Sequence, residues 1–483
     1  MIKQFLKDSL VYAAASLLSR GLSFLLVPFY SRFLSKQDFG LLDIGMSVVV
    51  IANVLIAMEI SQGMARSYSD EKSATERASY FMSSMTYLVA SYLVVGTILW
   101  IFKSQFSKLI FGSDLHIYLL EICYACSFAT ALQIQISNHY RWSLLAKKAA
   151  LYSVLQTLLT LTFTVVCVNL FKMAALGAIL GMTFSLFVLI SVEAFDLRSN
   201  FSGLVSWRKI RKMLSFSLPL VPSGVALFVT QFANRFIVND LMGADKVAEF
   251  AVAARISALV GLVMMGVGSS LMPLVSENAD HCDTPFKIAN IFHKIVGLSL
   301  IAVAVLTCFS DSWIALFSTS DYVNAAPLLG ILSLSTILSQ LYPFAPGFWL
   351  KKKVWLMVVI NVTMAVLGLI LNYLLIPRFG LIGVAYASLA SALCMMVMSI
   401  YLSHKLYPIP YVVFNLFGAL ITVTTLLVLH HVLLHSMSFT WRIQNFINGI
   451  IVLLSLASVI VWKLLPAREL VVLWRSCVNK FAA

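Results

Sequence analysis

The sequence predicts an all-α integral membrane protein with about 14 transmembrane helices. Fourteen apolar stretches follow one another along the 483 residues, and each is long enough to cross a bilayer, which needs about 20 mainly apolar residues. Hydrophobic residues make up 60% of the chain, and its mean hydropathy is +0.93. The loops are too short to form a soluble domain, so we expect the protein to do its work inside the bilayer.

The predicted spans fall into three groups. Six come first, at 10–34, 40–62, 79–102, 116–138, 150–171 and 173–195; six more follow a basic loop, at 214–238, 248–275, 290–316, 325–349, 354–376 and 380–403; the last two are 410–433 and 444–465. Span 116–138 is the least apolar, because it contains Glu121, Gln133 and Gln135. The first span is too long for a cleaved signal peptide and carries Arg20, so we expect it to remain as a membrane helix.

The formal net charge of +14 is explained by where the basic residues fall. With residues 1–9 placed in the cytoplasm, the loops on that side carry 23 of the 34 Lys and Arg residues, and the loops on the other side carry 8. Basic residues collect on the cytoplasmic side of membrane proteins. We therefore predict a multi-pass protein with both termini in the cytoplasm, and the charge requires no nucleic-acid partner.

Two weak sequence echoes indicate an internal repeat. FLSKQDFGLLDIGMS from Phe33 is echoed by LMGADKVAEFAVAARIS from Leu241, and VNLFKMAALGAILG (168–181) by LNYLLIPRFGLIGVA (371–385). An even number of spans separates the copies, so the two halves have the same orientation about an axis along the membrane normal. The predicted domains are an N-lobe of six spans (1–197), a cytoplasmic inter-lobe loop (198–213), a C-lobe of six spans (214–406), and two extra helices with a cytoplasmic tail (407–483).

Three arginines lie inside predicted spans, where a charge costs about 2.5–3.5 kcal/mol unless it faces water or a partner. Two of them share a helix face with polar neighbours at three- or four-residue spacing. We interpret them as the lining of a water-filled cationic cavity for an anion, because arginine binds phosphate in forked geometry. The alternative is that they form internal salt bridges that fix helix packing. The expected substrate-binding residues are Arg20, Arg235, Arg255, Ser16, Ser23, Gln231 and Asn234.

Carboxylates inside the spans are the available counter-charges. They are Asp43, Glu59, Glu121 and Glu193. Asp43 and Glu121 are candidates for proton or sodium sites, with structural pairing as the alternative. The C-x-x-C formed by Cys123 and Cys126 lies on an apolar helix with no second Cys or His pair nearby, so we interpret it as packing. We expect no metal site and no cofactor.

Two motifs carry a family resemblance. SLLSRGLSFLLVPFYSRFLSKQDFGLLD (16–43) has an internal Arg in the first span, then a Pro-aromatic-x-x-Arg run and an aromatic-Gly pair that opens the second span. LNYLLIPRFGLIGVAYASLAS (371–391) has an Ile-Pro-x-aromatic-Gly-x-x-Gly-small segment. In these regions, and in length and span count, the chain resembles the polysaccharide-transporter (Wzx-type flippase) branch of the multidrug/oligosaccharidyl-lipid/polysaccharide (MOP) exporter superfamily.

The resemblance implies a V-shaped, MATE-like transporter rather than an enzyme. It implies movement of undecaprenyl-diphosphate-linked oligosaccharide from the cytoplasmic to the periplasmic leaflet of the bacterial inner membrane, for O-antigen (lipopolysaccharide), capsule or exopolysaccharide biosynthesis. It assigns the pyrophosphate to cationic cavity residues, which carries over to Arg20 by position and to Arg235 and Arg255 by location only. Expected partners are the lipid-linked oligosaccharide, membrane lipid, a coupling ion (H+ or Na+), a polysaccharide polymerase and a chain-length regulator.

Three other functions compete with this one. A lipid II flippase would share the architecture, although the early part of the chain lacks that branch's denser set of arginines. A multidrug or organic-ion antiporter should prefer acidic cavity residues, which Arg20 opposes. A membrane glycosyltransferase or polymerase would need catalytic carboxylates and usually a long outer loop, and no predicted outer loop exceeds about fifteen residues.

Overall fold

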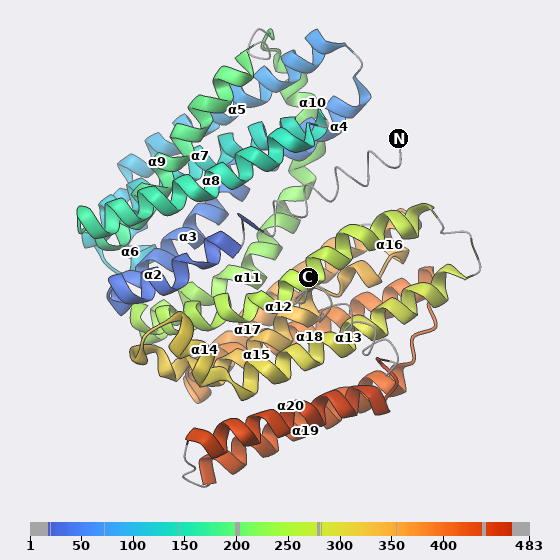
Figure 1. The fold of residues 1–483 in the computed structure, drawn as a ribbon. Helices are drawn as coiled ribbons and strands as arrows, with labels where there is room; N and C mark the ends of the chain where they lie inside the picture. Colours follow the sequence, from blue (N-terminus) through green and yellow to red (C-terminus); the bar gives the residue numbers. More distant parts are fainter. Residues whose placement is uncertain are drawn as a thin grey trace, which may run out of the picture. The chain divides into compact units, whose positions relative to one another are not determined.

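The computed structural model describes residues 18–19, 21–71, 73–143, 145–198, 203–277, 281, 283–353, 355–436 and 441–465. Over these ranges the chain consists of α-helices joined by turns, with short 3-10 and π segments and no strand (Figure 1). Arg20, Ser16, part of the predicted inter-lobe loop and both predicted cytoplasmic termini lie outside the described residues.

Twelve helical segments of the described chain are long and apolar enough to cross a membrane. Each overlaps one of twelve of the fourteen predicted spans. The other two predicted spans, 10–34 and 248–275, overlap helices α2 (Leu26–Phe33) and α12 (Ala244–Glu277). The prediction of an all-α integral membrane fold is confirmed, whereas the count of fourteen and the two-lobe arrangement stay predictions.

The first of two compact units comprises Met1–Ala251 and Asn361–Val384. Within it α3, α7, α8 and α9 pack against one another, and Phe81, Tyr140 and Met213 lie fully buried in its core. Besides α2 and the start of α12 it holds α3 (Lys36–Ala57), α4 (Ile60–Asp70), α5 (Ala74–Ile101), α6 (Lys103–Phe111), α7 (Ile117–Trp142), α8 (Ala146–Val165), α9 (Ala174–Asp196), α10 (Trp207–Ser217), α11 (Val221–Met242) and most of α17 (Trp355–Phe379).

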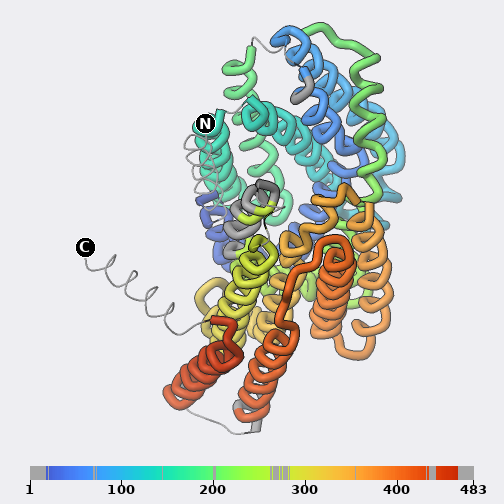
Figure 2. The backbone as a smooth tube through the Cα atoms, turned by 90° about the vertical axis from the view of Figure 1, so that its right-hand side faces the viewer, coloured from blue at the N-terminus to red at the C-terminus, as the bar shows by residue number. Residues whose placement is uncertain are grey.

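The second unit comprises Val252–Ile360 and Ala385–Ala483. Phe292 and Phe344 are buried in its core, with ring centroids 5.1 Å apart. Figures 1 and 2 both show α19 and α20 side by side, and the pair packs on α13. Its helices are the rest of α12, α13 (Thr284–Cys308), α14 (Ser310–Phe317), α15 (Ala326–Ser339), α16 (Gly347–Leu350), most of α18 (Leu381–Leu406), α19 (Val413–Ser436) and α20 (Trp441–Val461).

Several helices begin where the sequence carries a capping residue. The Ser35 hydroxyl accepts a hydrogen bond from the Asp38 amide at 3.0 Å at the start of α3, and Ser73 does the same for Glu76 at 3.4 Å at the start of α5.

The span predicted as one helix at 40–62 is interrupted in the structure. It ends as α3 at Ala57 and resumes as α4 at Ile60, and neither Pro nor Gly stands at the break.

Candidate functional site

Four of the predicted site residues meet where α3 and α11 pack together. The Arg235 Nε donates to the Asp43 Oδ2 at 2.6 Å, and only 11% and 6% of the two side chains is exposed. The Arg235 Nη1 donates to the main-chain oxygen of Gln231 at 2.7 Å and to the Asn234 Oδ1 at 3.2 Å. These two additional hydrogen bonds satisfy N–H groups of the buried guanidinium. They stabilise the ion pair, because a charge without partners in a low-dielectric interior costs free energy.

Two aromatic rings flank the same guanidinium. The ring centroids of Phe232 and Phe250 lie 5.0 and 5.5 Å from the Arg235 Cζ, within the range of a cation–π contact. In this conformation Arg235 therefore joins α3 to α11 as an internal salt bridge. An anionic ligand would have to compete with Asp43 for it.

A second charged cluster lies at the start of α3 and was missed by the sequence analysis. Glu249, only 2% exposed, accepts from the Lys36 Nζ at 3.2 Å and from the Lys246 Nζ at 2.8 Å. One turn into α3, a Cβ placed on Gly40 would lie 1.9 Å from the main-chain oxygen of Ala244, so the two backbones approach closely. The internal repeat aligned the segments that begin at Phe33 and Leu241, and this alignment was the one feature of the sequence that could have indicated the cluster.

The remaining predicted residues lie in other settings. Glu121 pairs with Lys103 at 3.0 Å, and about a third of each side chain is exposed (34% and 38%). The Ser23 hydroxyl is exposed and donates to the main-chain oxygen of Ser19 at 2.8 Å. Arg255 is half-buried on α12 in the second unit. Within the described residues no group of three or more His, Cys, Asp and Glu side chains is arranged to hold a metal ion.

A cavity of about 350 Å³ opens in the first unit between α3, α4, α5 and α7. This volume lies within the usual range of small-molecule sites. Val, Ala, Ile and Leu side chains form its apolar lining, and Glu59 is the one carboxylate among the lining residues, which include no Lys or Arg. Its polar lining residues are Asn53, Glu59, Ser61, Gln62, Thr130, Gln135 and Asn138.

Two residues that line this cavity have buried amide oxygens without a hydrogen-bond partner. The Asn53 Nδ2 donates to the main-chain oxygens of Val49 at 3.0 Å and Ser127 at 3.2 Å, and its buried Oδ1 has no partner among the described residues. Gln135 is 1% exposed, and its Nε2 donates to the Ser84 Oγ at 2.7 Å while its Oε1 has no partner there either. With the Glu59 carboxylate, these oxygens suit a ligand rich in hydroxyl donors, and they do not suit a phosphate.

Glu59 enters the cavity at a strained point of the backbone. Met58 and Glu59 both adopt left-handed conformations, with φ values of 48° and 53°, between the end of α3 and the start of α4. Such a conformation costs a non-glycine residue roughly 1–2 kcal/mol. Strained residues of this kind concentrate at functional sites. Gly224 of α11 lies against the break, since a Cβ there would come 3.1 Å from the Glu59 Oε1.

Comparison with known families gives two matches. The family model described as Polysaccharide biosynthesis protein matches residues 5–279, and the model described as MatE matches residues 219–374. A Shigella flexneri protein named "Putative O-antigen transporter" is 25% identical over 218 residues, which are 43% of this chain and 51% of that protein. The match thus spans about half the length of the curated relative.

Solved structures share the fold. The chain is similar to "Lipid II flippase MurJ, inward closed conformation" with a TM-score of 0.74 and 14% identity, over 92% of this chain and 98% of that one. It is also similar to the inward-facing conformation of a multidrug resistance MATE family transporter, with a TM-score of 0.66 and 14% identity, over 82% of this chain and 98% of that one. At such identities the likeness shows the fold alone.

Proposed function

Because the chain belongs to the Polysaccharide biosynthesis protein family, whose model matches residues 5–279, we propose that it moves undecaprenyl-diphosphate-linked oligosaccharide units across the bacterial inner membrane. The units would feed the biosynthesis of a surface polysaccharide such as O-antigen, capsule or exopolysaccharide. The family match confirms the resemblance to the polysaccharide transporters of the MOP superfamily, and the relative named an O-antigen transporter supports the proposed substrate.

The physical difficulty of this reaction lies in the headgroup. Sugar hydroxyls and a diphosphate cannot cross hydrocarbon unaided, because each polar group that loses water without a new partner costs several kcal/mol. A transporter must replace that water while the polyprenyl tail stays in lipid. The observation that carries the proposal is the polar cavity inside the membrane helices of the first unit, with its unpartnered acceptor oxygens of Asn53 and Gln135.

We propose a division of roles between sugar and diphosphate. Sugar hydroxyls would donate to Glu59 and, once their buried amide oxygens turn toward the cavity, to Asn53 and Gln135. The lining residues of this cavity include no cation. The diphosphate needs cations, for which Arg20, Arg235 and Arg255 remain the candidates.

The coupling ion belongs to the same proposal. Protonation of Asp43 would weaken its 2.6 Å pair with Arg235 and release the guanidinium to the diphosphate, which would couple a proton to transport. Glu121 is the other candidate carboxylate, and it pairs with Lys103. Substrate would shift the two-lobe equilibrium only through different affinities for the two states.

Complementation tests the proposal. The chain should restore surface polysaccharide to a bacterium that lacks its own O-antigen-unit transporter, as measured by gel electrophoresis of extracted lipopolysaccharide. Gln135→Leu should abolish this export at normal membrane levels, because it removes an unpartnered acceptor from the cavity. The matched control is Asn372→Leu, at a buried amide of α17 that also has an unpartnered oxygen but lies outside the cavity lining.

Three results would count against it. Full export by Gln135→Leu would show that the cavity does not bind the transported headgroup. Rescue of cells depleted of their lipid II flippase, without restored polysaccharide, would assign the chain to peptidoglycan precursors. Drug resistance conferred on a sensitive strain, again without polysaccharide, would favour the multidrug antiporters.

A further inference from the structure

We propose that the outward face of α10 is a binding surface for anionic membrane lipid. The helix reads WRKIRKMLSFS, with four basic residues among its first six. Its buried residues, Ile210, Met213 and Ser217, recur at three- and four-residue spacing and define the face that packs toward α4 and α5. The opposite face of α10 points away from α4 and α5, and we call it the outward face.

That outward face combines apolar and cationic side chains. Trp207 is 74% exposed, and the residues just before the helix, Leu204 and Val205, are 84% and 51% exposed. Arg208 and Arg211 are exposed one turn apart beside them. Among the described residues neither arginine has an acidic partner.

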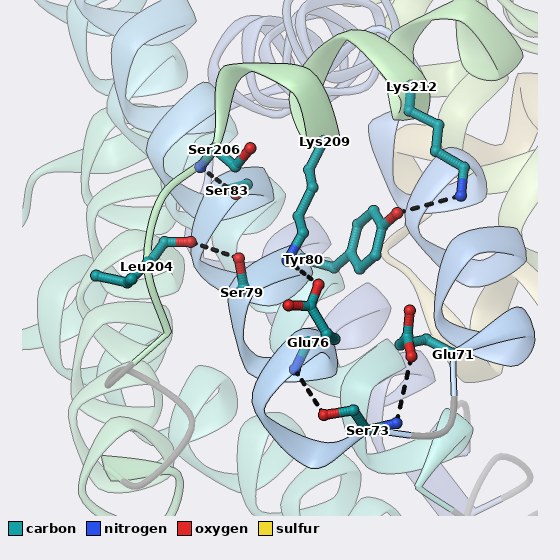
Figure 3. Close-up of polar contacts among 10 residues, drawn as sticks. All are labelled: Glu71, Ser73, Glu76, Ser79, Tyr80, Ser83, Leu204, Ser206, Lys209 and Lys212. Atoms are coloured by element: carbon teal, nitrogen blue, oxygen red, sulfur yellow. Dashed lines mark hydrogen bonds and ion pairs between the residues drawn. The ribbon is translucent and has the colours of Figure 1, made fainter.

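The two lysines of α10 are used differently from its arginines. The Lys209 Nζ lies 2.6 Å from the Glu76 Oε2 and 4.8 Å from the centre of the Tyr80 ring (Figure 3). The Lys212 Nζ donates to the Tyr80 hydroxyl at 3.2 Å (Figure 3). Both lysines therefore bind α10 to residues of α5, whereas the exposed side chains of Arg208 and Arg211 can bind a ligand outside the unit.

Main-chain contacts fix the segment that leads into α10. The Ser206 amide donates to the Ser83 Oγ at 3.0 Å, and the Ser79 hydroxyl donates to the main-chain oxygen of Leu204 (Figure 3). The exposed face is thus held in one orientation relative to α5. A pre-oriented surface loses less side-chain and backbone freedom on binding.

The mixture of side chains identifies the ligand. A protein partner would need an apolar patch set beside its carboxylates to cover this face. A nucleic acid in water would meet the arginines but would leave no apolar phase for Trp207 and Leu204. A bilayer interface offers both, since tryptophan prefers the headgroup level and arginine binds lipid phosphate. The helix also continues through Leu218–Leu220 into α11, and Trp207–Met242 together form one candidate membrane span, which places this face at the end of a membrane helix.

Fluorescence quenching tests the proposal on the full-length protein in lipid nanodiscs. The probes are brominated phosphatidylglycerol, which is anionic, and brominated phosphatidylcholine, which is neutral overall. The chain has nine tryptophans, so the signal of Trp207 is taken as the difference between the wild type and Trp207→Phe. We expect the anionic lipid to quench Trp207 more strongly, with a preference of roughly 30-fold for two arginines at an anionic surface. The preference should vanish near 1 M salt, where charges are screened beyond about 3 Å.

The double variant Arg208→Gln/Arg211→Gln should remove the preference while Trp207 is still quenched by both lipids. Arg208→Lys/Arg211→Lys should keep most of it, which separates loss of charge from loss of fold. The matched control is Arg378→Gln, at an exposed arginine in the last turn of α17. Equal quenching of the wild type by both lipids would overturn the anionic preference, and absence of quenching by either would show that this face does not meet lipid.

Discussion

The starts of α3 and α12 approach closely at Gly40, and a single methyl group there tests that contact. A Cβ on Gly40 would lie 1.9 Å from the main-chain oxygen of Ala244, whereas real Cβ contacts essentially never fall below 3.0 Å. Gly40→Ala must therefore move the two helix starts apart by about 1.1 Å, the difference of these distances. The neighbouring bond of 3.2 Å between Lys36 and Glu249 would lengthen with it.

The expected cost of that overpacking is about 1–3 kcal/mol. It opposes the gain of about 1 kcal/mol that alanine brings over glycine in a helix, so the net effect should be a lower thermal unfolding temperature. Unfolding of the purified protein in detergent measures this directly. The matched control is Gly449→Ala in α20, where nothing lies within 4 Å of the added methyl group, so the unfolding temperature should stay the same or rise.

Export is the second measurement on the same variant. If contact between the 36–40 and 243–249 segments belongs to one state of the transport cycle, Gly40→Ala should lower surface polysaccharide at normal membrane levels. An unfolding temperature and an export level both equal to those of Gly449→Ala would refute the close approach of α3 and α12.

Three further substitutions follow from individual contacts. Asp43→Ala should destabilise the protein by about 3–5 kcal/mol, because it leaves Arg235 buried without its partner. In chemical unfolding, the double variant Asp43→Ala/Arg235→Leu should recover part of this loss. A double variant no more stable than Asp43→Ala would contradict the expectation. Glu121→Gln should cost no more than about 1 kcal/mol, since its pair with Lys103 is partly exposed, so any loss of export would reflect a role in transport. Ser35→Ala should cost about 1 kcal/mol through its lost N-cap, whereas Ser35→Asn, which can accept from the Asp38 amide and donate to the Asp38 carboxylate, should retain stability. Equal unfolding temperatures for the two variants would rule the cap out.

The sequence predicted the membrane helices well because hydropathy is a property of one segment at a time. It did not predict the break between α3 and α4, because Met58 and Glu59 belong to residue types that rarely adopt positive φ. Only packing of the neighbouring helices can hold such a conformation, as Gly224 of α11 illustrates by lying against Glu59.

The sequence could place neighbours of Arg235 only where the geometry is local. Arg235 donates to the Asn234 side chain, but its bond to Gln231 is to the main-chain oxygen, which any residue at that position would offer. Its ion-pair partner, Asp43, is 192 positions away and was one of four possible counter-charges. The cavity around Gln135 could not be predicted, since it exists only where four helices meet.

Transport by the reconstituted protein tests the central claim most directly. The measurement is the movement of a polyprenyl-diphosphate-linked oligosaccharide, labelled on its sugar, between the leaflets of proteoliposomes, detected by loss of access to a membrane-impermeant lectin. We predict movement well above that in protein-free liposomes, and a loss of about tenfold or more in Arg20→Ala, since a charge-assisted hydrogen bond contributes about 1.5–3 kcal/mol. Movement no faster than in protein-free liposomes, with the protein correctly inserted, would contradict the account.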